Sequence, residues 1–189
     1  IFEPGLQELF EQVRAGSGGG SFRPVDQSDE QINQSAVSMI CVGTPTLPDH
    51  SVDLTQIQDT CERIGKVIKI QDRVHHVIIR STIPPGTTED IVIPGLEKSS
   101  GKKEGRDFWV TFYPEFLREG QGLEDMYQPS LNIVGCKDDL QIELIKEVFK
   151  DVTRPPIKTS IRTAEMIKYA NNSFHAVKVA FTNEIATIA

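Results

Sequence analysis

The sequence contains few cysteines, and their spacing fits neither a disulfide framework nor a metal site. Its 189 residues include three cysteines, Cys41, Cys61 and Cys136, which lie far apart in the chain. Disulfide scaffolds and zinc sites need paired or clustered cysteines. We therefore interpret all three as reduced side chains, mostly buried, and expect a cytoplasmic protein without a metal site. The chain begins at Ile1 with no signal-peptide pattern.

Long apolar runs and an excess of positive charge are also missing. The longest apolar runs are about six residues, against the roughly 20 needed to span a membrane. Lysine and arginine number 20 against 27 aspartates and glutamates, a net charge of −7, and no basic tract stands out. Such a balance does not favour binding to a nucleic-acid backbone. We expect neither a membrane nor a nucleic acid as partner.

Four short segments are apolar on successive residues, as is typical of strands buried on both faces of a parallel sheet. They are residues 37–42, 76–82, 108–113 and 131–135. Helical periodicity follows Asp53, and it also follows Asp138 or Asp139, which can each cap a helix. Strands that alternate with amphipathic helices predict an α/β fold, with a mainly parallel sheet flanked by helices.

Helical patterns also occur at both ends of the sequence. One follows Pro4 and is ended by the glycine-rich residues 16–21, which predict a flexible loop, with a short strand at 22–25. At the other end, residues 164–189 contain no helix-breaking residue and predict one long helix. The apolar residues of this helix recur every three or four positions and predict a continuous buried stripe: Ile167, Ala170, Phe174, Val177, Phe181, Ile185 and Ile188.

The glycine-rich residues 16–21 nearly spell the dinucleotide-binding fingerprint G-x-G-x-x-G. That fingerprint works only after a strand and at the start of a helix, where backbone amides meet the pyrophosphate. Here the glycines follow a predicted helix. We therefore reject the fingerprint at this position.

Small hydroxyl side chains follow two of the predicted strands, at the edge where ligands of open α/β sheets bind. Thr44 follows the first strand, and Ser81 and Thr82 end the second. Their hydroxyls could reach a phosphate or a ribose. The alternative is that these residues only mark where a strand passes into a loop. This alternative is somewhat favoured over ligand binding for Thr44, and the two are about equally supported for Ser81 and Thr82.

Charged and polar side chains form two further groups. Glu115 and Glu119 stand four residues apart, on one face if the segment is a helical turn, and could serve as base and water-orienting group. An acidic first turn exposed to solvent is the alternative. Lys168, Asn172 and His175 form a polar stripe on the long helix. The stripe fits either a solvated face or a donor pair for an oxyanion.

Four motifs in this order resemble those of the UDP-glucose/GDP-mannose 6-dehydrogenases. They are V-G-T-P at 42–45, S-T-I-P-P-G-T at 81–87, P-E-F-L-R-E-G at 114–120, and A-E-x-x-K-Y-x-x-N, continuing to N-E, at 164–184. The resemblance runs from Glu3 to the end of the chain. It implies NAD-dependent oxidation of the C6 hydroxyl of a nucleotide sugar to the uronic acid, through an aldehyde and a cysteine thioester. His175 and its neighbours are closer to the GDP-mannose branch.

The resemblance also implies roles for individual residues, carried over motif by motif. The implied catalytic residues are Glu115, Glu119, Thr82, Lys168 and Asn172. Those implied to bind substrate are Phe116, Leu117, Arg118 and His175. Those implied to border NAD are Thr44, Ser81, Thr82 and Glu119. The long helix would form a homodimer contact.

The sequence departs from the family pattern at its ends. The family's strand with G-x-G-x-x-G would precede Ile1, and its nucleophilic cysteine would follow Ala189. We therefore expect an internal fragment that is inactive alone. Residues 1–160 would be the C-terminal part of a Rossmann-like NAD-binding domain without its first βαβ unit, and 161–189 the start of the central helix. Tyr113 replaces the family's usual asparagine.

The alternative to an enzyme fragment is a non-catalytic dimerisation or scaffold module.

Overall fold

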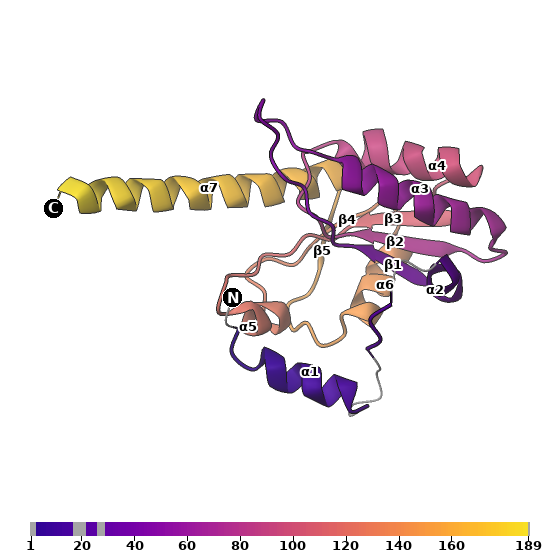
Figure 1. Ribbon diagram of the computed structural model, residues 1–189, viewed down its shortest axis with the longest axis horizontal. Helices are drawn as coiled ribbons and strands as arrows, with labels where there is room; N and C mark the ends of the chain where they lie inside the picture. Colours follow the sequence, from indigo (N-terminus) through magenta and orange to yellow (C-terminus); the bar gives the residue numbers. More distant parts are fainter. Residues whose placement is uncertain (1–2, 17–21, 26–28, 189) are drawn as a thin grey trace.

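A computed structural model describes residues 3–16, 22–25 and 29–188, and it is built on a five-stranded sheet (Figure 1). The strands lie in the order of the sequence: β1 (Val37–Ile40), β2 (His75–Ile79), β3 (Phe108–Phe112), β4 (Ile133–Gly135) and β5 (Ile157–Thr159). The first three are parallel, β4 runs antiparallel to β3, and β5 is parallel to β4. The predicted α/β fold with a mainly parallel sheet is confirmed. The strand β5 was not predicted, because its three residues are largely exposed.

Helices cover both faces of this sheet (Figure 1). One face carries α3 (Thr55–Ile70) and α4 (Ile93–Ser100), with the π-helix η1 (Thr88–Val92) leading directly into α4; α6 (Asp139–Val148) lies on the other face. Asp138 caps α6 as predicted, in a capping box completed by the side chain of Gln141. Asp53 precedes α3 and binds its first residue: the Asp53 Oδ1 accepts a hydrogen bond of 2.9 Å from the Thr55 amide.

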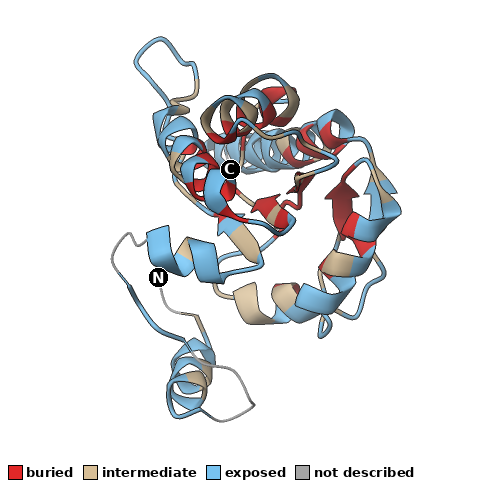
Figure 2. Ribbon diagram, turned by 90° about the vertical axis from the view of Figure 1, so that its right-hand side faces the viewer, coloured by how far each residue is buried: buried red, intermediate tan, exposed pale blue. Residues whose placement is uncertain are grey.

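The sheet separates two hydrophobic cores. Side chains of β2 and β3 that point to one face pack against α3, η1 and α4 and form the larger core, which includes Val77, Val110 and Leu96. Side chains on the other face pack against α6 and form the smaller core, which includes Val134 and Ile145. Figure 2 shows these buried residues gathered on the strands and on the inner faces of the helices. The continuous apolar runs of the sequence reflect burial on both faces.

Three short helices lie at the periphery: α1 (Leu6–Arg14), α2 (Asp29–Gln34) and α5 (Gly122–Tyr127). The helix predicted after Pro4 corresponds to α1. The strand predicted at 22–25 is wrong, because these residues have no regular structure. The predicted glycine-rich loop falls mostly on residues 17–21, which lie outside the described residues.

The long helix α7 (Ile161–Ile188) begins three residues before the predicted start at Ala164 and leaves the body of the molecule (Figure 1). Its first turn packs on β4 at Gly135, where an added Cβ would lie 2.7 Å from the Ala164 Cβ and 2.9 Å from the Ile161 Cα. The apolar stripe is exposed beyond the first turns of α7 in this single chain, and its burial in a homodimer contact stays a prediction. Phe181 is 66% exposed and Ile188 81%, because nothing in the described chain packs against them.

The contact at Gly135 generates a prediction about stability. Gly135→Ala should lower the free energy of unfolding by about 2 kcal/mol, because the new methyl would overlap helix backbone that cannot move aside without shifting α7. Gly43→Ala is the matched control, since nothing lies within 4 Å of its Cβ position, and it should change stability by less than about 0.5 kcal/mol. Urea denaturation of both variants measures the difference. Equal stabilities would contradict the close packing.

Candidate active site

The polar residues predicted from the sequence come together through the parallel strands and α7. Because β1, β2 and β3 are parallel, the loops that follow them leave the same edge of the sheet. Those loops carry Thr44, Ser81, Thr82 and Glu115. The buried residues Ile161 and Ala164 fix the start of α7 in the larger core. Lys168 follows one turn later.

The structure brings Lys168 and Glu115 into direct contact. The Lys168 Nζ lies 2.9 Å from the Glu115 Oε1 and also donates a hydrogen bond to the Glu115 backbone carbonyl. The Lys168 side chain is only 5% exposed, and the Glu115 side chain is 31% exposed. The ammonium also lies 5.3 Å from the centre of the Phe116 ring. A buried cation is thus held against a carboxylate that remains accessible from solvent.

Glu115 is held in its ionised form. Burial raises the pKa of its carboxyl, but this effect is outweighed by the hydrogen bonds from Lys168 and from the Leu117 amide and by the positive charges of Lys168 and Arg80. The resulting pKa lies below the usual value of a glutamate. At neutral pH the group can therefore accept a proton but has none to donate.

The hydroxyl groups predicted to border a cofactor tie the loops together. The Thr44 hydroxyl donates to the Thr82 carbonyl at 2.7 Å, and the Ser81 hydroxyl donates to the Val42 carbonyl at 2.7 Å. Each bond joins the loop after β1 to the loop after β2. A hydroxyl that donates one hydrogen bond can still accept another. Thr44 is half-buried, whereas Ser81 is buried. Thr82 itself is half-buried.

The segment that follows β3 is a loop and not a helical turn, so the condition for Glu115 and Glu119 to share a helix face is not met. Glu119 is exposed in a turn, and no hydrogen bond or ion pair joins it to Glu115 within the described part of the chain. Arg118 instead forms a two-pronged ion pair with Asp125 of α5, at 2.7 Å and 3.0 Å. Leu117 is exposed, whereas Phe116 is buried in the larger core.

Asn172 and His175 lie farther along α7 and are exposed. Their spacing places them on the side of the helix that carries Lys168. The described residues contribute no side-chain hydrogen bond to either. Of the polar stripe on the long helix, the structure joins only Lys168 to the loops at the sheet edge.

Two acidic residues that sequence reasoning missed also organise this edge. Glu3 accepts hydrogen bonds from the amides of Gly120 and Leu123 at 3.1 and 3.2 Å, although it lies more than a hundred residues away in sequence. Glu165 is fully buried and accepts hydrogen bonds from two amides of the loop after β2. No local pattern distinguishes Glu3. Glu165 could have been noticed because it lies three residues before Lys168 on the same helix.

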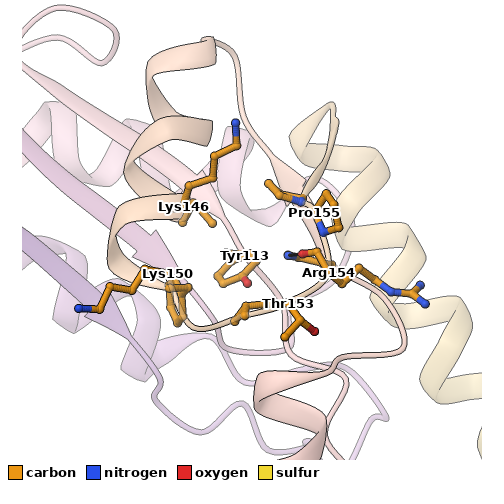
Figure 3. A pocket seen from close by; sticks show the side chains of 11 residues that line it. Tyr113, Lys146, Lys150, Thr153, Arg154 and Pro155 are labelled. Atoms are coloured by element: carbon orange, nitrogen blue, oxygen red, sulfur yellow. Dashed lines mark hydrogen bonds between the residues drawn. The ribbon is translucent and has the colours of Figure 1, made fainter. Parts of the chain in front are cut away.

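A cavity of about 230 Å³ lies between α6 and residues 152–156, with Tyr113 among its lining residues (Figure 3). It contains neither Glu115 nor Lys168. The charged ends of Lys146, Lys150 and Arg154 point away from its centre (Figure 3). A smaller space of about 20 Å³ adjoins Glu115 itself and is lined by Arg80, Tyr113 and Phe116, among others. The candidate site is therefore defined by the contacts of Glu115 and Lys168 and not by the size of a cavity.

Among the described residues, no three His, Cys, Asp or Glu side chains are grouped so that they could hold a metal ion. A search of the same residues found no helix both long enough and apolar enough to cross a membrane.

Comparison with known proteins identifies relatives along the whole chain. The profile of the UDP-glucose/GDP-mannose dehydrogenase family, NAD binding domain, matches residues 1–153, and the profile of the family's central domain matches residues 162–189. The GDP-mannose 6-dehydrogenase of Pseudomonas putida is 42% identical over 189 residues. The UDP-glucose 6-dehydrogenase of Haloferax volcanii is 35% identical over 193 residues. Each alignment covers 100% of this chain but only 42% and 44% of the relative.

Solved structures show the same fold. A ternary complex of GDP-mannose dehydrogenase from Pseudomonas aeruginosa superimposes with a TM-score of 0.89 at 40% identity, covering 97% of this chain and 42% of that one. A UDP-glucose dehydrogenase from Pyrobaculum islandicum superimposes with a TM-score of 0.85 at 36% identity, covering 98% and 41%. The fold is therefore the Rossmann-like fold of these dehydrogenases.

The ion pair at the sheet edge generates a prediction about titration. In Lys168→Met the pKa of Glu115 should rise, because burial remains while the ammonium and its hydrogen bond are lost. Carbon-13 NMR of labelled glutamate carboxyls measures it. Lys146→Met, which breaks the exposed Lys146–Glu143 pair, should leave the pKa of Glu115 unchanged.

The same shift has a consequence for stability. Because the folded pKa of Glu115 lies below its unfolded value, the pair stabilises the fold above the unfolded pKa. This stabilisation is lost as the pH falls through the folded pKa. The Lys168→Met variant should therefore lose less stability over that acidic interval than the unaltered chain. An unchanged Glu115 titration would contradict the contact.

Proposed function

Because this chain belongs to the UDP-glucose/GDP-mannose dehydrogenase family, we propose that the whole protein oxidises the C6 hydroxyl of a nucleotide sugar to a uronic acid with NAD. The chain spans about 42% of the length of the P. putida enzyme that it matches. GDP-mannose is the first substrate to test, since the GDP-mannose 6-dehydrogenase has the higher identity of the two relatives compared above. UDP-glucose is the second.

One observation carries the proposal: the buried contact between Lys168 and the ionised Glu115. Oxidation of an alcohol to an acid requires a group that removes protons and a donor that stabilises negative oxygen. Glu115 supplies the first, as base or by holding water. Lys168 supplies the second, assisted by Asn172. Burying a lysine away from water is costly, which argues against a purely structural module.

The residues at the ends of β1 and β2 fit one side of a NAD site. Thr44 and Ser81 are tied to neighbouring carbonyls but can still accept hydrogen bonds. Nothing lies within 4 Å of the Cβ position of Gly43, so the backbone there is open to close approach. Thr44, Ser81, Thr82 and Glu119 would border the cofactor. Bound NAD supplies the acceptor for the hydride removed from the sugar.

The remaining site residues contact the nucleotide sugar in this proposal. Phe116, Leu117, Arg118 and His175 would bind it. The pair of Arg118 with Asp125 and the bonds from Glu3 to Gly120 and Leu123 hold the loop that presents these residues. Thr82 and Glu119 would hold water near the reacting carbon. In this division, residues 1–160 form the cofactor domain and 161–189 the first part of the central helix.

The exposed apolar stripe of α7 supports a homodimer. Large apolar side chains contiguous on one helix face are unusual on the surface of a monomer. Here they include Phe174, Val177, Phe181, Ile185 and Ile188. A second copy of the same helix would cover them with a self-complementary contact. The product, a nucleotide-linked uronic acid, would serve polysaccharide biosynthesis in the cytoplasm.

A kinetic experiment tests the proposed reaction. The full-length protein should form NADH, read at 340 nm, with GDP-mannose or with UDP-glucose. Lys168→Ala should lower kcat by about 10²–10³-fold with a smaller change in KM, because an oxyanion donor acts where charge develops. Lys146→Ala, which alters an exposed pair, should retain full activity. No NADH with either sugar would refute the function, and an increased KM at unchanged kcat would make Lys168 a binding residue.

A second experiment tests the dimer. Light scattering of the 189-residue chain at micromolar concentration should give the mass of two copies. Phe181→Asp should give a monomer, because a charge would be buried in the contact. Asn183→Asp adds the same charge on the opposite side of α7 and should leave the dimer intact. A monomeric parent chain would refute the proposal.

A further inference from the structure

Glu165 is a buried carboxylate that binds two backbone amides of a distant loop. Its Oε2 accepts a hydrogen bond of 2.5 Å from the Gly86 amide, and its Oε1 accepts one of 2.8 Å from the Thr88 amide. Glu165 itself is fully inaccessible to solvent. Gly86 lies in the segment that connects β2 to η1, and Thr88 is the first residue of η1. The first turn of α7 is thereby bonded to a loop almost eighty residues earlier in the chain.

The bonds to Glu165 compensate for a large desolvation cost. Burying a carboxylate without compensation is strongly unfavourable, and the described residues include no ion pair to Glu165. Two amides at the start of a helix supply that compensation, because they point toward an anion and carry the positive end of the helix dipole. In this geometry each amide donates to a different oxygen of the carboxylate, so both oxygens are used. A glutamine of equal size would set an NH₂ group against one amide.

The position of Glu165 connects the two loops of the candidate site. The loop that it binds also carries Thr82, and Lys168 lies three residues farther along α7, with its ammonium on Glu115. Arg162 of α7 adds an exposed link to η1, through ion pairs of 2.6 Å to Glu89 and to Asp90. Of these two links, only that of Glu165 is buried and reaches the loop backbone.

We propose that Glu165 is a positioning residue for Lys168: by fixing the first turn of α7 to the Gly86–Thr88 backbone, it sets where the Lys168 ammonium meets Glu115. It contacts neither Lys168 nor Glu115 and acts through the rotation and depth of the helix. The effect on turnover rests on the function proposed above. The effect on the ion pair does not.

The first test is independent of activity. Glu165→Gln should raise the pKa of Glu115, measured by carbon-13 NMR, toward its value in Lys168→Met, because the displaced ammonium no longer stabilises the carboxylate. Arg162→Gln is the matched control: it cuts the exposed link and should leave the Glu115 titration unchanged. An unchanged Glu115 pKa in Glu165→Gln overturns the proposal, as does an equal shift in Arg162→Gln. If Glu165→Gln does not fold, Glu165→Asp, which retains the charge but reaches less far, takes its place with the same expected shift.

The second test uses turnover by the full-length protein. Glu165→Gln should lower kcat about 10- to 100-fold with less than a threefold change in KM for the nucleotide sugar, because a small misplacement of a catalytic group is costly. In a Lys168→Ala background it should have no further effect, since the group through which it acts is gone. Additive losses overturn the positioning role. If the parent protein oxidises neither sugar, the proposed function fails while the titration still decides the role of Glu165.

Discussion

The placement of the candidate site depends on one close contact, that of the first turn of α7 with the backbone of β4 at Gly135. A glycine is required there because Ala164 and the backbone at Ile161 occupy the space that a side chain would need. Close packing of this kind permits little sliding or rotation of the helix. The contact sets how close the first turns of α7 lie to the sheet, and the hydrogen bonds of Glu165 attach the same part of the helix to Gly86 and Thr88. In this position the Lys168 ammonium meets Glu115.

Three charged side chains are buried near the edge of the sheet where α7 meets the loops. Lys168, Glu165 and Asp125 all lie almost out of solvent near this sheet edge. Lys168 and Asp125 have partners of opposite charge, and Glu165 has two amides. Such arrangements stabilise a fold less than apolar packing of the same volume would. Departures from apolar packing of this kind are expected at functional sites, which agrees with the function proposed for this edge.

Much of the fold could be predicted from the sequence because its signals are local. Apolar runs indicated the first four strands, and Asp138 indicated the start of α6. The strand β5 could not be predicted, since three largely exposed residues carry no periodicity, and its pairing with β4 is a tertiary effect. The conformation of the loop after β3 stayed open, because spacing alone cannot distinguish two glutamates on a helix from two on an extended chain. Periodicity also showed that one face of α7 is apolar, but it does not show what covers that face.

The same limit applies to the candidate site. Glu115 and Lys168 were singled out from motifs, but their contact joins residues 53 positions apart and follows only from the packing of α7. Glu3 could not be found, because a carboxylate that holds a loop over a hundred residues away has no sequence signature. Glu165 lies within a motif that was noticed, yet its function depends on the path of the loop at Gly86.

The antiparallel junction between β3 and β4 is the part of the sheet with the least backbone pairing. Among the described residues, β3 and β4 share a single register pair, Phe112 with Gly135, whereas β2 and β3 share five. The side chain of Gln141 in α6 bridges part of the junction, donating to the Val110 carbonyl and the Thr111 hydroxyl at 2.7 and 2.8 Å. The sheet thus consists of a β1–β2–β3 part and a β4–β5 part that share little backbone pairing. Because α7 packs on β4 at Gly135 and is hydrogen-bonded through Glu165 to Gly86 and Thr88 beyond β2, the helix that carries Lys168 also joins the two parts of the sheet.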